Sequence, residues 1–157
     1  MKLRIAVLGT IALAASMAAL AQPSTDAGVG TWTLNVEKSK FEAGSGLKSE
    51  TRTYEETPDG LRMTSNLQTA NGESHTETTT YKTDGKSYPV SNNPNIDTIK
   101  VARVSNREVR STQLRAGKVV GHLTRVVSKD GKTMTITIEV TTPSGQSEHE
   151  VRVYDRQ

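Results

Sequence analysis

The sequence offers one pair of side chains that could serve as general acid and base, His75 and Glu77. They stand two residues apart in a run that reads as a strand, so both lie on the same face. A histidine beside a carboxylate can exchange protons near neutral pH. No nucleophile elbow, zinc-protease motif or phosphate loop accompanies them, and the chain has no cysteine. We therefore expect a protein that is not an enzyme, with this pair as the best catalytic alternative.

Three histidines, His75, His122 and His149, fall on different expected strands. Inside a barrel they could meet around a metal that keeps one open position. The sequence contains no His-x-His pair and no repeated carboxylate pattern beside them. The expectation is therefore that the protein holds no metal and no cofactor.

The elements that would position these groups begin at the only tryptophan of the chain. Trp32, Leu34 and Val36 share one face of the segment Thr31–Glu37, and polar residues alternate with them. A large aromatic side chain on the first strand buries much area. Trp32 is therefore predicted to be a structural plug at one end of a β-barrel.

The first 21 residues read as a signal peptide. Lys2 and Arg4 precede the apolar run Ile5–Leu20, and Ala19–Ala21 is a small-x-small cleavage site. The alternative is a membrane anchor, but that run is shorter than the roughly 20 apolar residues needed to span a bilayer. The expected product is one domain, residues 22–157, in the periplasm or secreted, with Pro23–Val29 as a frayed tail.

Composition excludes several classes of function. Removing the leader takes away Lys2 and Arg4, so the net charge falls from +3 to +1. No basic block remains, and nucleic acid is not an expected partner. The absence of cysteine excludes disulfides and an acylated cysteine anchor, so stability must come from a core. No stable membrane anchor is therefore expected after cleavage.

After the leader, the chain alternates between strand-like runs and turn signals. Asn71-Gly72, Asp84-Gly85 and Asp130-Gly131 are strong hairpin signals because both turn positions favour a positive φ. The strands are expected at 31–37, 49–57, 61–69, 73–83, 97–104, 108–114, 118–128, 132–142 and 146–154. The segment Ser87–Asn95, with two prolines, is expected to be a long loop.

These strands predict an all-β fold, a single antiparallel up-and-down barrel of about eight to ten strands. An open meander of this length would expose two edges, and closure removes them. The expected inner faces mix threonine, serine and aliphatic residues, which indicates a lumen rather than a solid interior.

At Gly30–Trp32 and at Val151–Asp155 the sequence resembles the calycins, that is, lipocalins and intracellular fatty-acid-binding proteins. Gly30–Phe41 and the hairpin Val126–Met134 are also similar to small exported bacterial lipocalin-like proteins, and this second resemblance covers nearly the whole mature chain. The resemblance implies a barrel with a cavity for a small hydrophobic or amphipathic molecule. The sequence differs from fatty-acid-binding proteins in one respect, because the segment Lys38–Lys48 is too short and too glycine-rich to form a helical lid.

The same resemblance implies that Arg152 and Tyr154 hold a carboxylate head group. They lie two apart and share a strand face, and a guanidinium with a phenol suits a carboxylate. Two structural alternatives remain: both side chains could face solvent, or Arg152 could stack on Trp32. His75 and Tyr81 are added as ligand contacts because they share the polar inner face expected for 73–83.

The function expected from the sequence is therefore to carry or sequester a small hydrophobic or amphipathic ligand. Ligands that bear a carboxylate are included in this class. The alternative is a protein-interaction or inhibitor module built on a closed barrel, in which loops such as Tyr88–Asn95 make the contacts. A barrel enzyme using His75 and Glu77 is the third class.

Overall fold

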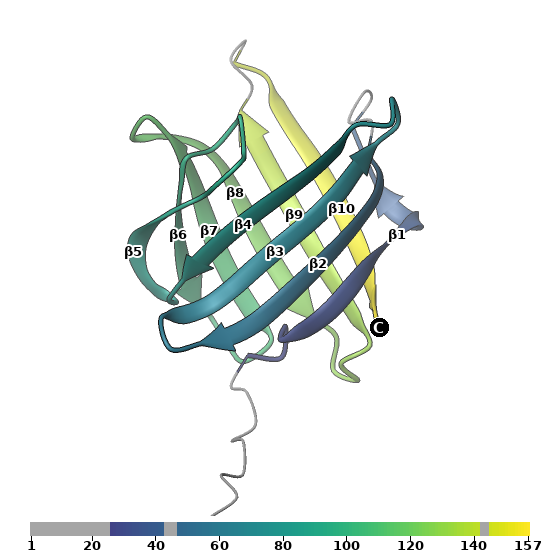
Figure 1. Ribbon diagram of the computed structural model, residues 1–157, viewed down its shortest axis with the longest axis horizontal. Coiled ribbons are helices and arrows are strands. Elements are labelled where there is room, and N and C mark those ends of the chain that lie inside the picture. The colour runs from purple at the N-terminus through teal and green to yellow at the C-terminus, as the bar shows by residue number, and fades with distance from the viewer. Residues whose placement is uncertain (1–25, 43–46, 142–144) are drawn as a thin grey trace, which may run out of the picture.

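The computed structural model describes residues 26–42, 47–141 and 145–157, and this part of the chain is all-β (Figure 1). The expected signal peptide, Met1–Ala21, lies outside the described residues. Within the described ranges there is no helix, in keeping with the expectation of a barrel without a helical lid. It follows that no described helix is long and apolar enough to cross a membrane.

Ten strands follow one another along the chain. They are β1 (Gly30–Lys40), β2 (Leu47–Thr57), β3 (Gly60–Thr69), β4 (Ser74–Tyr81), β5 (Asp84–Pro89), β6 (Thr98–Arg103), β7 (Glu108–Arg115), β8 (Lys118–Val127), β9 (Thr133–Thr141) and β10 (Ser147–Arg156).

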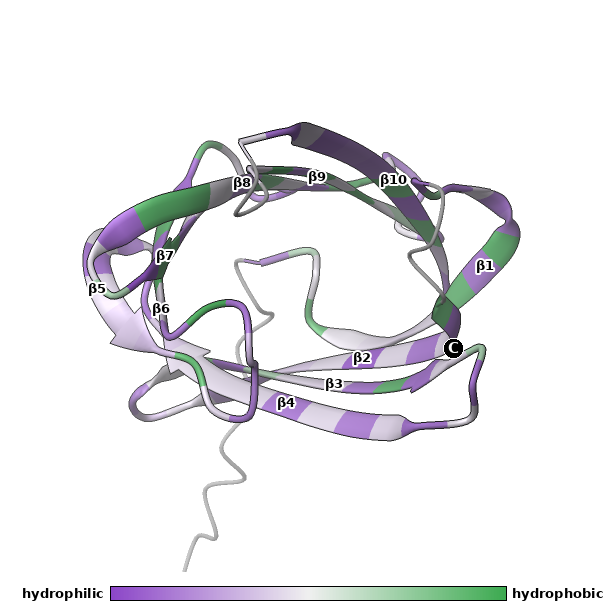
Figure 2. Ribbon diagram, turned by 90° about the horizontal axis from the view of Figure 1, so that it is seen from above, coloured by the Kyte–Doolittle hydropathy of each residue, from purple (hydrophilic) through white to green (hydrophobic). Residues whose placement is uncertain are grey.

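All ten strands belong to one antiparallel sheet with the order β4-β3-β2-β1-β10-β9-β8-β7-β6-β5. Strands that neighbour each other in sequence pair with each other, except β4 and β5, and β1 also pairs with β10. Figure 2 looks into the resulting ring. The prediction of a single up-and-down antiparallel β-barrel is confirmed.

The ten strands agree with the expected eight to ten, but β5 was not among the expected strand ranges, because it lies where a turn and the loop Ser87–Asn95 were expected. Asp84–Pro89 pairs with β6, with Tyr88 opposite Ile99 and Pro89 opposite Thr98. Proline cannot donate to a ladder, and its place at the end of an edge strand satisfies that restriction. The strand was missed because Asp84-Gly85 reads as a hairpin turn and Pro89 reads as a strand breaker.

The barrel is nearly closed, and its seam runs between β4 and β5. These strands stand at opposite ends of the sheet order, so Asp84-Gly85 does not join a paired hairpin. An isolated bridge links Thr78 to Ser91, and Thr79 Oγ1 donates to the carbonyl oxygen of Pro89 over 2.8 Å. The expectation that closure removes both edges is therefore met only in part.

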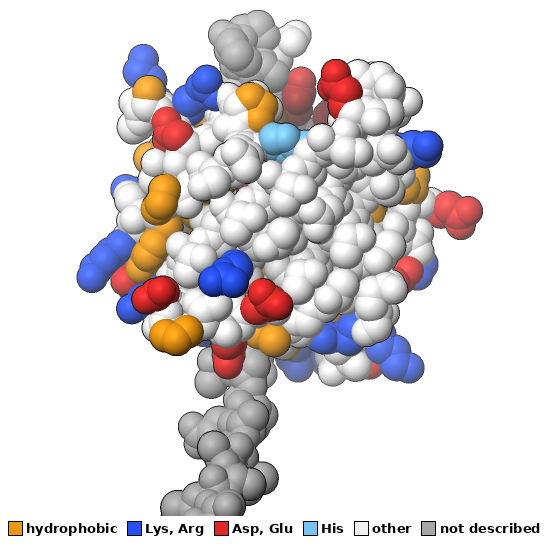
Figure 3. All heavy atoms as spheres, viewed as in Figure 1, with side chains coloured by type: hydrophobic (Ala, Val, Ile, Leu, Met, Phe, Trp, Pro, Cys, Tyr) orange, Lys and Arg blue, Asp and Glu red, His pale blue; other side chains and the backbone are white. Residues whose placement is uncertain are grey.

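Alternation along the strands decides which side chains face inward. In β9, Met134 and Ile136 are completely buried and the threonines between them are only half-buried. On the outside, the face formed by β2, β3 and β4 shows few hydrophobic side chains (Figure 3). The core therefore lies inside the ring, as expected from a period of two residues.

The expected frayed tail is wrong for residues 26–29. Asp26 is 3% exposed, and the backbone N–H of Ala27 donates to the carbonyl oxygen of Asn106 over 2.8 Å. This segment is held by charged side chains of distant strands, which a local reading of a Ser/Gly/Asp-rich segment cannot detect.

Gly60, at the start of β3, should be the least replaceable glycine of the described turns. Its φ is +136°, and a Cβ built there would collide with the carbonyl oxygen of Tyr81. We expect Gly60→Ala to lower the free energy of unfolding by about 2–3 kcal/mol, because strain and a backbone clash act together. Urea unfolding measures this loss.

The matched control for Gly60 is Gly72→Ala. Gly72 has a φ of +89°, but a Cβ there would meet no atom within 4 Å, so only backbone strain remains. Equal losses for the two variants would show that the contact with Tyr81 adds nothing.

Candidate ligand-binding site

The inner faces of the strands enclose a cavity of about 880 Å³. Buried Tyr54 and Tyr81 bound it at one end, and Asn95 and Val119 bound it at the other. Val119 is 56% exposed, so the lining reaches the surface there. We call this end the mouth and the opposite end the floor. The volume lies within the roughly 300–1,000 Å³ that is typical of small-molecule sites.

One half of the lining is predominantly apolar. It comes from β6 to β9, where inward positions carry branched aliphatic residues, and the pattern is clearest in β9. These residues are Ile99, Val101, Val109, Leu123, Ile138 and Val140. Such a surface suits the apolar part of a ligand.

The other half of the lining carries few branched aliphatic residues and several charged and polar side chains. It comes from β2, β3, β4 and β10, which follow one another around the ring except for β1 (Figure 2). Its polar members include Arg52, Ser65, Glu77, Thr79, Glu148 and Arg152. We call this half the polar wall. The cavity is therefore amphipathic across its width.

A buried carboxylate organises the polar wall from behind. The side chain of Glu50 is completely buried and accepts four hydrogen bonds. Oε1 accepts from Arg52 Nε at 2.5 Å and from Ser65 at 2.6 Å. Oε2 accepts from Tyr154 at 2.7 Å and from Arg152 Nη1 at 3.3 Å. We call these five residues the Glu50 cluster.

The protonation state of Glu50 follows from these contacts. Burial alone would raise the pKa of this carboxyl group, since it penalises the charged form. Arg52 and Arg152, with two hydroxyl donors, outweigh burial and lower the pKa to about 2. Glu50 is therefore ionised at neutral pH. Burial raises the pKa of the Tyr154 hydroxyl, which stays protonated and donates.

Arg152 is held by a second carboxylate. Its Nε and Nη2 donate to Glu150 Oε2 over 2.9 and 2.7 Å. Glu150 is mostly buried, with its side chain 12% exposed. Arg152 thus lies between two carboxylates and still lines the cavity.

The floor is closed by Trp32, which is fully buried. Its Nε1 donates to the carbonyl oxygen of Gly28 over 2.7 Å. The guanidinium of Arg156 stacks on its ring at 4.1 Å and donates to the carbonyl oxygens of Ala27 and Val29. Stacking on Trp32 is therefore made by Arg156, and Arg152 lies in the Glu50 cluster.

A fully buried arginine, Arg125, completes the floor. Its Nη2 donates to Asp26 Oδ1 over 2.5 Å, and its guanidinium lies over the ring of Tyr54 at 4.6 Å. Arg103 approaches the other oxygen of Asp26 at 3.5 Å. A Cβ at Gly28 would collide with Arg125, so this position needs glycine to let the backbone approach. The N-terminal segment is thus fixed to the barrel by charge.

The structure distributes the four predicted ligand contacts over three places. Arg152 and Tyr81 line the cavity. Tyr154 is fully buried behind the lining, where its hydroxyl donates to Glu50. His75 does not line the cavity.

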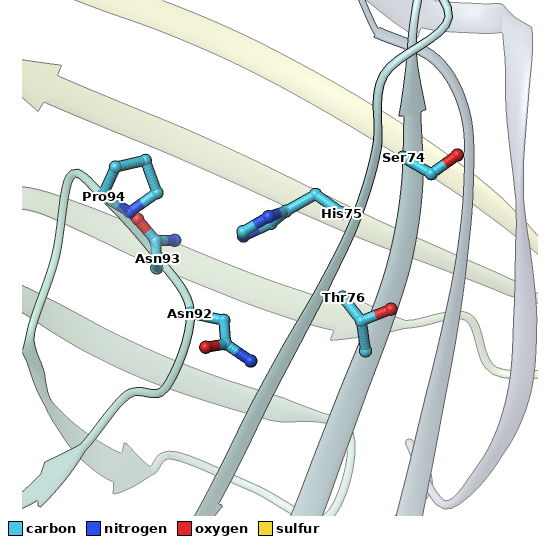
Figure 4. Close-up of a pocket in the computed structure, with 6 residues that line it drawn as sticks. All are labelled: Ser74, His75, Thr76, Asn92, Asn93 and Pro94. Carbon is cyan, nitrogen blue, oxygen red and sulfur yellow. The ribbon is translucent and has the colours of Figure 1, made fainter.

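His75 lies instead at a separate pocket of about 650 Å³ on the rim (Figure 4). It shares this pocket with its strand neighbours and with the loop Asn92–Pro94. Glu77, which faces the cavity, accepts a hydrogen bond from Asn93 over 2.5 Å. His75 Nε2 is buried without a hydrogen-bond partner, so this nitrogen does not contact Glu77. The rim pocket is lined only by 74–76 and 92–94, whereas the cavity offers both apolar and polar side chains, and we favour the cavity.

The remaining histidines lie on the surface. His122 and His149 are exposed, and His149 approaches Glu139 at 3.9 Å. No group of three His, Cys, Asp or Glu residues within the described ranges is arranged to hold a metal.

Sequence reasoning missed Glu50, Arg52 and Arg156. Glu50, Arg52 and Tyr54 occupy alternate positions of β2, which is a usable signal for a shared face. Without further information, however, two charged residues on one strand face predict that this face is exposed to solvent. Arg156 continues the inward series of Arg152 and Tyr154 and stands opposite Trp32 in the ladder.

The described part of the chain is thus a ten-stranded up-and-down antiparallel β-barrel with an internal cavity. Among solved structures, the chain is similar to zebrafish ileal bile acid-binding protein complexed with cholic acid. The TM-score is 0.51 at 12% identity, over 84% of this chain and all of that chain. At this identity the similarity shows the fold alone.

A second solved structure, the siderocalin Ex-FABP, is similar with a TM-score of 0.42 and 13% identity, over 84% of this chain and 75% of that one. Both neighbours are binding proteins by name. No protein-family model and no curated protein matches the sequence.

Proposed function

We propose that this protein binds a small amphipathic molecule inside its barrel, after export to the periplasm or beyond. The observation that carries the proposal is the cavity of about 880 Å³ with one apolar half and one polar wall. A ligand that places an apolar face against β6–β9 and polar atoms against Arg52 and Arg152 would satisfy both halves. The cholic acid bound by the zebrafish neighbour belongs to the same broad class of molecule.

Export rests on the leader and on the resemblance of Gly30–Phe41 to exported bacterial lipocalin-like proteins. A ligand-binding barrel of this kind would carry or sequester its ligand rather than transform it. The experiment that tests binding is therefore an occupancy measurement and not an assay of turnover.

The test uses the neutral fluorescent probe phenylnaphthylamine and a variant that fills the cavity. Ser111 lines the cavity from β7, so Ser111→Phe should weaken probe binding by at least about tenfold, equivalent to about 1.4 kcal/mol. Native mass spectrometry of the unmodified protein from a periplasmic extract should show an additional bound mass. Thermal unfolding confirms that the variant is folded.

The matched control is Thr112→Phe. Thr112 is the next residue of β7 and does not line the cavity, so probe binding should be unchanged. No probe binding by the unmodified protein, or equal binding by both variants, would reject a ligand site inside the barrel.

A further inference from the structure

The two arginines of the polar wall bring no net positive charge to the cavity. Arg52 and Arg152 face the cavity, and both guanidinium groups contact carboxylates of the chain itself. Glu50 lies behind both, and Glu150 contacts Arg152. Two positive and two negative side chains therefore meet here. A ligand approaching this wall meets hydrogen-bond donors without a net positive charge.

Several of the donors that could hold an anion already contact carboxylates of the chain. All three nitrogens of Arg152 donate to carboxylates, and Nε of Arg52 donates to Glu50. The hydroxyl of Tyr154 also donates to Glu50. The pairing of a guanidinium and a phenol around one carboxylate is thus complete within the protein.

A guanidinium has five N–H groups, and Arg152 uses three in these contacts. N–H groups therefore remain for a further acceptor on the cavity side. An uncharged oxygen can accept such a bond without bringing a charge out of water. A carboxylate or sulfonate would lose its hydration beside Glu50 and Glu150. The charges of the two arginines are already neutralised by these carboxylates, so they would not offset the cost of desolvation.

We infer that the ligand group at the polar wall is uncharged, a hydroxyl, carbonyl or amide, and that Glu50 and Glu150 select against anionic ligands. This inference rests on the proposed binding function and names the ligand class for the same cavity. It replaces the expectation that Arg152 and Tyr154 hold a ligand carboxylate. Three further cationic residues line the cavity outside the polar wall. Arg125 at the floor contacts Asp26 and Tyr54. Arg115 and Lys118 lie beside Val119 at the mouth, away from Glu50 and Glu150.

The test compares two probes that share one skeleton. Phenylnaphthylamine is neutral, and anilinonaphthalenesulfonate adds a single anionic group. Because the neutral probe is also more hydrophobic, the informative quantity is the ratio of the two affinities in each variant. Glu50→Gln keeps the size of the side chain and removes its charge. We expect the ratio to move about tenfold toward the anionic probe.

Glu150→Gln is the second variant. It removes one of the two carboxylates that neutralise Arg152 and leaves the buried Glu50 in place, so it should shift the ratio in the same direction. The inference therefore stays testable if Glu50→Gln does not fold. The matched control is Glu55→Gln, which removes the same charge from an exposed position of the same strand, β2. Its ratio should equal that of the unmodified protein.

The outcomes separate the two proposals. An unchanged ratio in every folded variant of Glu50 and Glu150, with both probes bound, would overturn the inference and leave the binding function standing. Binding of neither probe to the unmodified protein would reject the binding function itself. A ratio that shifts equally in Glu55→Gln would also overturn the inference, because it would reflect overall charge rather than the polar wall.

Discussion

Glu50→Ala is expected to lower the free energy of unfolding by about 3–5 kcal/mol. The substitution leaves Arg52 and Arg152 close together without their shared counter-charge, and it leaves Tyr154 and Ser65 without an acceptor. Removing one partner of a buried charge cluster costs more than the cluster contributes, because the remaining charges stay desolvated. Urea unfolding at neutral pH, followed by the fluorescence of the single tryptophan, measures the loss.

The same group predicts how stability depends on pH. The folded pKa of Glu50 is about 2, below the ordinary value of 4.5, so its stabilisation is complete above pH 4.5. That stabilisation, about 3 kcal/mol by linkage, is lost as the pH falls from about 4.5 toward 2. The difference in unfolding free energy between the unmodified protein and Glu50→Ala should therefore shrink over this range.

Glu55→Ala is the control, because Glu55 is exposed on the outer face of β2. Its loss should be within about 0.5 kcal/mol of zero. A Glu50→Ala loss as small as this, or a difference that does not change with acid, would show that the Glu50 cluster contributes little to stability.

The second large effect is expected at the floor of the barrel. Trp32→Ala should cost about 3–5 kcal/mol, since it empties a fully buried aromatic site and removes the surface on which Arg156 stacks. It also removes the hydrogen bond from Nε1 to Gly28. Circular dichroism must follow the unfolding, because no other tryptophan remains.

Trp32→Phe separates the two contributions. The phenyl ring keeps an aromatic surface below Arg156 but cannot donate to Gly28, so an intermediate loss is expected. A Trp32→Ala protein within about 1 kcal/mol of the unmodified one would show that the floor repacks without the indole.

Local patterns predicted the fold well because they arise from neighbouring residues. Alternation in Thr133–Thr141 and turn pairs such as Asn71-Gly72 and Asp130-Gly131 act over a few positions. The failure at Asp84–Pro89 has the opposite cause. That strand, β5, does not form a hairpin with β4. It is extended because it pairs with β6, which a local sequence pattern does not show.

The site was less predictable because its members are far apart in sequence. Glu50 is buried only because Arg152 and Tyr154 reach it from β10, more than a hundred residues later. Asp26 is buried only because Arg125 and Arg103 surround it. The strand face of Arg152 and Tyr154 could be proposed from their spacing, but the carboxylate that occupies their donors could not.

The pairing of β1 with β10 has a consequence for how the chain folds. In the described part of the sheet, every other ladder joins consecutive strands, whereas this one pairs residues such as Asn35 and Val153, and the side chain of Asn35 donates to Asp155, 120 positions away. Local hairpins close short loops and can form early on either side, whereas this ladder requires a long loop to close. Folding is thereby divided into two curved meanders and one docking step. The Glu50 cluster and the stack of Arg156 on Trp32 both span that junction, so the ligand cavity takes its final shape only when the docking step is complete.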